Sequence, residues 1–223
     1  MSTNLIIFIK KTIVTIIGLA LFALGSYLSI QANVGLAPWD AFSKGLSNVL
    51  GISFGSVVIF TGVIILIADY ILGEKIGVGT VLNTILIGIF TDIYISLEII
   101  PIVENIWVGI ITLLAGQTVL CIGSYFYIKN GLGCGPRDSL MVALSKRMSR
   151  VPVGLVRGLI EGSVLIIGWL LGAKIGIGTI ISVFGISFIL EITFKVFKFK
   201  VKDVKHDSLI DSFQYITESC KKA

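Results

Sequence analysis

Long apolar segments alternate with short polar connections over most of this chain. Each apolar segment is close to the roughly 20 residues that an α-helix needs to cross a bilayer core about 30 Å thick. The pattern predicts an all-α, polytopic membrane protein with six transmembrane helices, at about residues 13–30, 52–72, 78–97, 106–128, 151–171 and 175–197. The first segment is longer than the apolar core of about 7–15 residues of a signal peptide, and five spans follow it, so we interpret it as a retained helix.

An internal repeat divides the chain into two halves. The sequence Gly-x-x-Pro-x-Asp that begins at Gly35 recurs at Gly133, 98 residues later (133 minus 35). The sequence Gly-x-Gly-Thr that begins at Gly77 recurs at Gly176, 99 residues later (176 minus 77). Each half holds three predicted spans, an odd number, so the second half enters the membrane from the opposite face. We therefore predict a membrane domain (residues 1–199) of two inverted three-helix repeats, about 12–99 and about 106–198, as in many secondary transporters.

Each repeat has an additional segment between its first and second spans. Pro38 and Pro136 suit the first turn of a helix, and Asp40 and Asp138 suit its positive N-terminus. These residues predict short helices over about 38–50 and 136–148. Two interpretations remain open: the helices lie in the membrane interface and the aspartates only cap them, or they are re-entrant half-helices whose N-termini point at a central site for anionic or polar groups.

The composition excludes an ordinary soluble domain, because only 14% of the 223 residues are charged, 55% are hydrophobic and the mean hydropathy is +1.00. The net charge of +5 does not indicate nucleic-acid binding, since the basic residues gather in connections that the six-span topology places on one side. By the positive-inside rule that side is cytoplasmic, and both termini lie there. The residues concerned are Lys10, Lys11, Lys129, Arg137, Lys146, Arg147, Arg150, Lys195, Lys198, Lys200, Lys202 and Lys205.

The sequence offers little support for an enzyme or a cofactor. The single histidine, His206, lies in the C-terminal tail, so no span carries a Ser–His pair or a His-Glu-x-x-His zinc motif. Three scattered cysteines fit neither a disulfide framework nor a metal site. The Gly77-x-Gly79-Thr80 sequence lacks the Gly-Lys-Ser/Thr of a phosphate-binding loop and is interpreted as a tight interhelical turn. We expect no catalysis, cofactor or metal.

Polar side chains inside the predicted spans are the candidates for function, because a charge at the bilayer centre costs about 2.5–3.5 kcal/mol on insertion scales. Arg157 and Glu161 are four residues apart and can pair on one helix face. Glu161 lies near the middle of its span and is the strongest candidate, a purely structural ion pair being the alternative. Asn83 either joins two helices by a hydrogen bond or contacts a ligand. We expect three further acidic residues at the membrane interface: Asp69, Asp92 and Glu191.

These motifs together resemble the bacterial YczE/YyaS/YitT family of small integral membrane proteins. The resemblance covers residues 12–197 approximately and excludes the tail. It implies six spans in a bacterial plasma membrane, and it implies no established substrate and no residue roles. The residues that carry it are Gly35 to Ala41, Gly77-x-Gly79-Thr80 with Asn83, Gly133-x-Gly135-Pro136-Arg137-Asp138, Arg157-x-x-x-Glu161 and Gly176-x-Gly178-Thr179.

The leading functional prediction is a transporter or permease for a small polar or anionic solute, with its site where the two repeats meet. The alternative is a non-transporting membrane component, either a solute-binding subunit or an accessory protein of another complex. Expected partners are membrane lipid, a small-molecule solute and a possible cytoplasmic protein, but no nucleic acid; the oligomeric state stays open. The predicted substrate-binding residues are Pro38, Trp39, Asp40, Asn83, Arg137, Asp138, Arg157 and Glu161.

The last residues, 200–223, differ from the rest of the chain. Apolar residues recur at roughly helical spacing among charged residues: Val201, Val204, Leu209, Phe213 and Ile216. This pattern predicts a cytoplasmic tail that is either an amphipathic helix on the membrane surface or a flexible segment.

Overall fold

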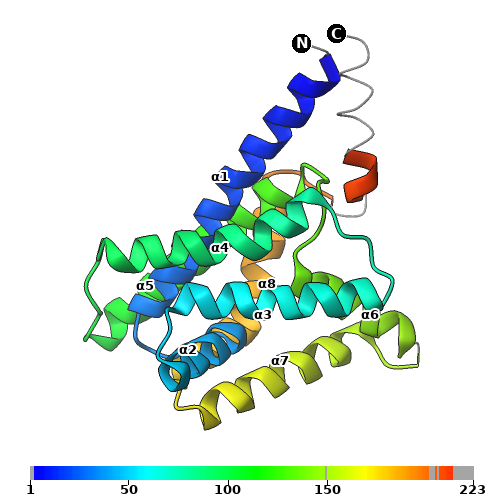
Figure 1. Cartoon of the computed structure of the whole chain (residues 1–223). Coiled ribbons are helices and arrows are strands. Elements are labelled where there is room, and N and C mark those ends of the chain that lie inside the picture. The colour runs from blue at the N-terminus through cyan, green and yellow to red at the C-terminus, as the bar shows by residue number, and fades with distance from the viewer. Residues whose placement is uncertain (1–2, 149, 201–203, 205, 213–223) are drawn as a thin grey trace.

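The computed structural model describes residues 3–148, 150–200, 204 and 206–212, and this part is all-helical, without strands. Its main helices, shown in Figure 1, are α1 (Thr3–Gln31), α2 (Pro38–Leu50), α3 (Phe54–Ile71), α4 (Val78–Ser96), α5 (Ile106–Ile128), α6 (Pro136–Arg147), α7 (Val153–Leu170) and α8 (Ile177–Val196). Among the described residues, six of these helices are long and apolar enough to cross a membrane: α1, α3, α4, α5, α7 and α8. The prediction of an all-α chain with six spans is therefore confirmed.

The two short helices begin at the predicted prolines. Proline fixes its own φ and lacks an N–H that the first turn could not use, so it starts α2 at Pro38 and α6 at Pro136. α2 ends where Gly51 takes a left-handed conformation (φ 67°), and the Gly51 N–H donates to the carbonyl oxygen of Ser47. Helix α3 then follows within three residues, capped by the Ser53 side chain.

Glycines bring α1 and α5 into backbone contact along the middle of the molecule. A Cβ atom on Gly18 would lie 2.8 Å from the carbonyl oxygen of Gly123, and a Cβ on Gly25 would overlap the carbonyl oxygen of Gly116. Small residues of this kind let two apolar helices approach closely. Gly116 and Gly123 stand 98 residues after Gly18 and Gly25, so each glycine contacts the counterpart of the other.

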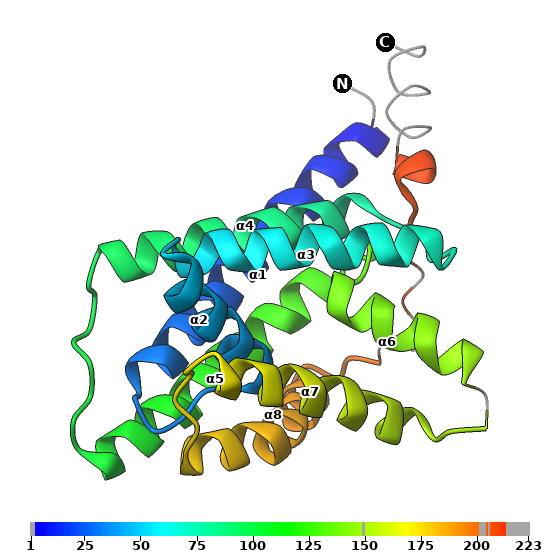
Figure 2. The same ribbon diagram turned by 60° about the horizontal axis from the view of Figure 1, so that its bottom comes forward.

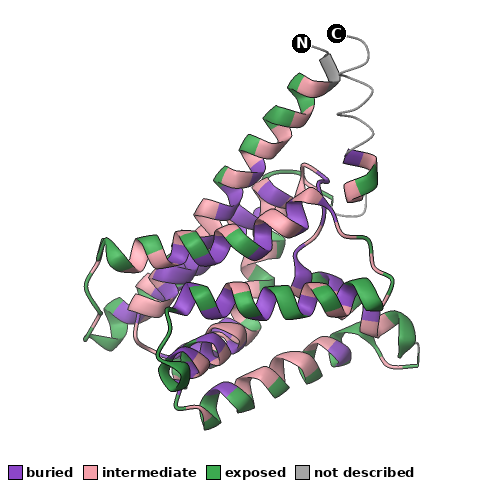
Figure 3. Ribbon diagram, in the orientation of Figure 1, coloured by how far each residue is buried: buried purple, intermediate pink, exposed green. Residues whose placement is uncertain are grey.

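The remaining helices pack both across the two halves and within them. Helix α2 lies along α7, and α6 lies along α3, while α4 packs on α1 and α8 on α5. Figure 2 shows α2 and α6 at opposite ends of the bundle. In Figure 3 the buried positions lie mainly on α1 to α5, whereas α7 is mainly exposed or intermediate. One cluster of buried apolar side chains joins these helices and consists of Leu19, Phe54, Val58, Ile87 and Tyr127.

Two local expectations need correction or fall outside the structure. Asp69, expected at the membrane interface, is buried, and within the described part of the chain neither carboxylate oxygen has a hydrogen-bond partner. Its span continues two residues beyond it, and the Glu74 N–H donates to the Asp69 carbonyl oxygen at 2.9 Å, so the α3–α4 connection turns back toward this residue. The helical pattern predicted for residues 200–223 falls almost wholly outside the described residues.

Candidate functional site

The segments that precede α2 and α6 are held by the Gly-x-Gly-Thr turns of the opposite halves. The Val34 carbonyl oxygen accepts from the Gly178 N–H at 2.8 Å, and the Leu132 carbonyl oxygen accepts from the Gly79 N–H at 2.7 Å. These two bonds are equivalent, since 132 follows 34 by 98 and 178 follows 79 by 99. The sequence predicts only tight connections at these turns, and the tertiary structure adds their docking role.

Glycine is required where these segments touch. Gly35 has φ +119°, and a Cβ there would lie 2.6 Å from the Gly176 nitrogen. Gly133 has φ +127°, and a Cβ there would overlap the Thr80 hydroxyl oxygen. No L side chain adopts such a φ comfortably, and none would fit against the neighbouring backbone. The two glycines therefore allow the chain to bend away from α1 and α5 and start a new helix inside the bundle.

A cavity of about 220 Å³ lies between the starts of α2 and α6 and the long helices around them. The volume is several times the roughly 30 Å³ that one water molecule occupies in the liquid, so a small solute fits. Apolar side chains form most of the wall, including Phe22, Val58, Ile87 and Leu120. All eight residues predicted from the sequence line this cavity: Pro38, Trp39, Asp40, Asn83, Arg137, Asp138, Arg157 and Glu161.

Arg137 and Trp39 contact each other where the two helix starts meet. The guanidinium carbon of Arg137 lies 4.7 Å from the centroid of the Trp39 ring, a cation–π arrangement. Each residue directly follows the proline that begins its helix, and Arg137 stands 98 residues after Trp39. In the described structure Arg137 has no ion pair and no side-chain hydrogen bond, so its N–H groups are available to a ligand in the cavity.

The two aspartates of the helix starts have one weak protein partner each. The Ser26 hydroxyl donates to Asp40 Oδ1 at 3.4 Å, and the Tyr127 hydroxyl donates to Asp138 Oδ2 at 3.4 Å. Neither aspartate caps its own helix through a side-chain hydrogen bond. Their carboxylates therefore keep most of their capacity to accept hydrogen bonds from a bound molecule.

Arg157 and Glu161 form the ion pair that their spacing predicted. Arg157 Nε donates to Glu161 Oε1 at 2.8 Å, one turn further along α7. The Arg157 side chain is 43% exposed and the Glu161 side chain is 21% exposed, so the pair borders the cavity and is not fully buried in the core. A single bond through Nε leaves the terminal nitrogens of Arg157 free for a further contact.

Asn83, Tyr127 and Ser182 are further polar residues of the lining. The described contacts give the Asn83 side chain no hydrogen bond, so the expected bond between helices is not observed there. Ser182, its counterpart in α8, accepts instead from Gln117 Nε2 at 2.8 Å. Sequence reasoning missed Ser26, Gln117 and Tyr127; polar positions at helical spacing inside the first and fourth spans were a signal that could have found them.

The fold and this site define a multi-pass integral membrane protein with a small internal cavity. Residues 9–195 match the family described as "Family of unknown function (DUF6198)", and the chain belongs to this family. It is 33% identical over 167 residues to the uncharacterized membrane protein YczE of Bacillus subtilis (strain 168), which covers 74% of this chain and 76% of that relative. It is also 27% identical over 172 residues to the uncharacterized protein YyaS of the same organism, covering 75% and 84% respectively.

A relative outside that genus shows similar coverage. The chain is 29% identical over 172 residues to an uncharacterized protein of Haemophilus influenzae, covering 77% of this chain and 78% of that relative. No solved structure matches the chain. The resemblance to YczE and YyaS is thus confirmed, while the resemblance to YitT stays a prediction.

Proposed function

We propose that this protein is a permease for a small polar or anionic solute, built from two inverted three-helix repeats with re-entrant helices α2 and α6. The observation that carries the proposal is the shared cavity at the Trp39–Arg137 contact. Equivalent residues of two repeats touch each other only near the axis that relates the repeats. Inverted-repeat transporters place their sites at this axis, with half-helix N-termini directed at the solute.

The charges of the cavity support a solute that carries both hydrogen-bond donors and hydrogen-bond acceptors. Three carboxylates (Asp40, Asp138, Glu161) and two guanidinium groups (Arg137, Arg157) give a formal charge of −1 (two minus three). The N-termini of α2 and α6 contribute about +0.5 each, which offsets this charge. A polar or zwitterionic solute fits such a nearly neutral site directly, and an anion fits when a proton enters with it.

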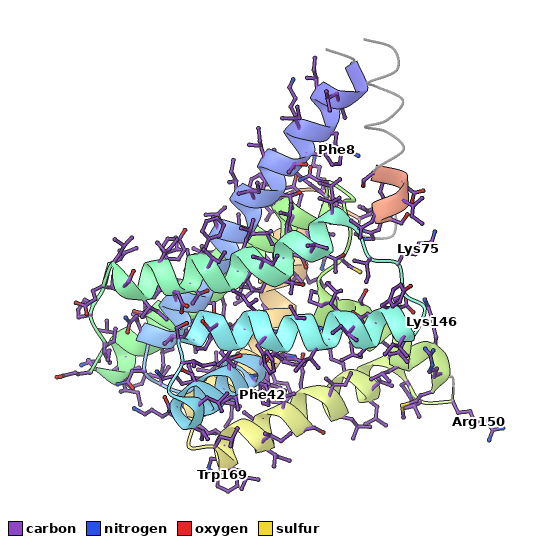
Figure 4. All side chains as sticks on the ribbon, in the orientation of Figure 1. Phe8, Phe42, Lys75, Lys146, Arg150 and Trp169 are labelled. Atoms are coloured by element: carbon purple, nitrogen blue, oxygen red, sulfur yellow. The ribbon has the colours of Figure 1, made fainter. Side chains whose placement is uncertain are left out.

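The distribution of basic residues supports the orientation with both termini in the cytoplasm. Lys75, Lys146 and Arg150 lie on the same side of the molecule in Figure 4. Lys146 also pairs with Glu74 at 2.8 Å, which joins the end of α6 to the α3–α4 connection on that side. Under the positive-inside rule this is the cytoplasmic side, and the α1–α2 and α7–α8 connections are extracellular.

A panel of ligands tests the proposal on the purified protein. A solute present at 100 times its Kd stabilises the folded state by about 2.7 kcal/mol. For a chain of this size we expect a rise in Tm of roughly 5–10 °C. The panel contains amino acids, organic anions, inorganic ions and vitamins, and each hit is then assayed for uptake into sealed vesicles. Binding without uptake, or no binding by any member of the panel, contradicts the permease and favours the non-transporting component.

We predict that Glu161→Gln abolishes coupling to a proton gradient while leaving binding largely intact. Glutamine keeps the size and hydrogen-bonding reach of the side chain but cannot carry a proton through the cavity. Uptake driven by an imposed pH gradient should fall about tenfold or more. Glu104→Gln, in an exposed connection, is the matched control and should behave as wild type. If the Glu161 variant binds and moves the solute as well as wild type, Glu161 is not the proton carrier.

A further inference from the structure

The α3–α4 hairpin is closed at the end opposite its turn. Asp92 of α4 accepts from the Gly55 N–H at 2.7 Å and from the Ser53 hydroxyl, both at the start of α3. A Cβ on Gly55 would overlap the Gly88 carbonyl oxygen, and one on Gly88 would overlap the Gly55 carbonyl oxygen. The two helices are thus in backbone contact here, which is possible because both positions are glycine. We name this contact of Ser53, Gly55, Gly88 and Asp92 the outer gate.

The α7–α8 hairpin carries the equivalent residues but is open. Adding 99 to the outer-gate numbers gives Pro152, Gly154, Ser187 and Glu191, which we name the inner gate. Nothing lies within 4 Å of a Cβ built on Gly154, and the same holds for Gly158, the counterpart of Ile59, which packs against Gly88. Ser187 and Glu191 are exposed, and Glu191 pairs instead with Lys195 of its own helix at 2.8 Å. Figure 1 shows α7 and α8 diverging from the turn that joins them.

Helix α7 is in backbone contact with α2 near its C-terminus, whereas its N-terminal half contacts α6 but not α8. A Cβ on Gly168, near its C-terminus, would lie 2.5 Å from the Phe42 nitrogen, so this end is in backbone contact with α2. The N-terminal half lacks comparable contacts with α8. It carries Arg157 and Glu161, which line the cavity together with Val183 and Ser187 of α8. Both helices of this hairpin therefore border the cavity.

We infer that the two hairpins are alternating gates of one transport cycle, and that this structure has the outer gate closed and the inner gate open. The inference rests on the proposed function and adds its access mechanism. In the opposite state the N-terminal half of α7 closes on α8, and Glu191 accepts from the Gly154 N–H. Helix α3 then separates from α4 and exposes Asp92. Two halves with the same sequence pattern can exchange these arrangements while the Trp39–Arg137 centre stays in place.

The sequence difference between the gates explains which of them is closed here. The outer gate has the Ser53 hydroxyl as a second donor to Asp92, whereas Pro152 at the equivalent position of the inner gate has no hydroxyl. In addition, Lys195 competes for Glu191, while its counterpart Ser96 cannot compete for Asp92. A hydrogen bond to a charged group favours the state that makes it, so these differences favour the arrangement with the outer gate closed and the inner gate open.

Distances between spin labels test the inference on the full-length protein in lipid nanodiscs. The cysteine-free background replaces Cys121, Cys134 and Cys220 by serine. One label pair, at Ser56 and Ile93, reports the outer gate, and the equivalent pair, at Leu155 and Ile192, reports the inner gate; all four positions are exposed. We expect short distances at the outer gate, and at the inner gate a major long and a minor short distance.

Two variants separate alternation from independent motion. Asp92→Asn weakens the outer gate, and the ratio of short to long distances at the inner gate should rise about tenfold as the outer distances lengthen. Gly154→Leu prevents closure of the inner gate, so its short distance should vanish, while Tm stays unchanged because the position faces open space. The inference is overturned if the distance distribution at the inner gate is the same in both variants as in wild type. It is also overturned if the outer gate opens and the inner gate does not close.

The outcomes for the gates and for the permease are distinguishable. Coupled changes in the two distances without uptake of any solute support the gates and contradict the permease. If Gly154→Leu takes up solute as well as wild type, and the label distances at both gates do not change among the variants, the gates are contradicted and the permease is supported.

Discussion

Replacing Arg137 by alanine is expected to weaken the binding of an anionic or zwitterionic solute by about 100-fold or more. Arg137 is the cavity cation without an ion pair or side-chain hydrogen bond in the described structure, so its N–H groups have no competing protein acceptor. Loss of a charge that pairs with a ligand in a desolvated site typically costs several kcal/mol. Isothermal titration calorimetry with any solute found in the ligand panel measures the effect.

Two variants show whether Arg137 acts on the solute or on the fold. Arg137→Lys keeps the charge but loses the planar fork, so binding should recover only in part. Arg150→Ala, at an exposed position of the α6–α7 connection, should bind like wild type. The alanine variant can also lose stability in the absence of ligand. If its loss in free energy of unfolding equals its loss in binding free energy, the residue neutralises Asp40 and Asp138 structurally and does not recognise the solute.

Gly25→Val is expected to destabilise the folded protein by about 3 kcal/mol, the upper end of the usual cost of overpacking. Its Cβ would overlap the backbone of α5 at Gly116 and Leu120, and backbone atoms cannot move aside as a flexible side chain can. Because α1 and α5 form the centre of the bundle, their separation also disturbs the helices that pack on them. Reversible unfolding in mixed detergent micelles measures the change in free energy.

Gly158→Val is the matched control for this experiment. Position 158 also lies in a membrane span, but nothing stands within 4 Å of its Cβ, and its counterpart in α3 is the β-branched Ile59. Its free energy of unfolding should stay within about 0.5 kcal/mol of wild type. Equal destabilisation by the two valines would mean that the cost comes from losing glycine in a membrane helix and not from the α1–α5 contact.

The proposed cycle gives a reason for two copies of one pattern that differ at a few positions in this chain. Identical halves would give two arrangements of equal free energy, and small differences set which is populated. Here Pro152 and Lys195 provide such differences at the inner gate, in place of Ser53 and Ser96. Variants that restore symmetry, such as Lys195→Ser, should therefore shift the resting protein toward closure of the inner gate.

The helices were accessible to sequence reasoning because each depends on local properties. Apolar length decides which segments can span a bilayer, and proline followed by aspartate decides where a helix can start. The predicted spans therefore agree with α3, α4, α5, α7 and α8 to within about two residues at each end, and Pro38 and Pro136 begin α2 and α6. Helix α1 extends back to Thr3 because Lys10 and Lys11 do not interrupt a helix, although they end an apolar run.

The internal repeat, and not any single motif, predicts which residues form the candidate site. Equivalent segments on two related halves must approach the same axis, so Trp39, Asp40, Arg137 and Asp138 could be grouped before any contact was known. Sequence alone determined the spans, the short helices and this set of residues. The length of the apolar segments, the positions of proline and the internal repeat can all be recognised along the chain without knowledge of spatial contacts. The tertiary structure decided the Trp39–Arg137 contact, the docking of Gly35 and Gly133, the burial of Asp69 and the difference between the gates, because each depends on which backbones approach one another in space.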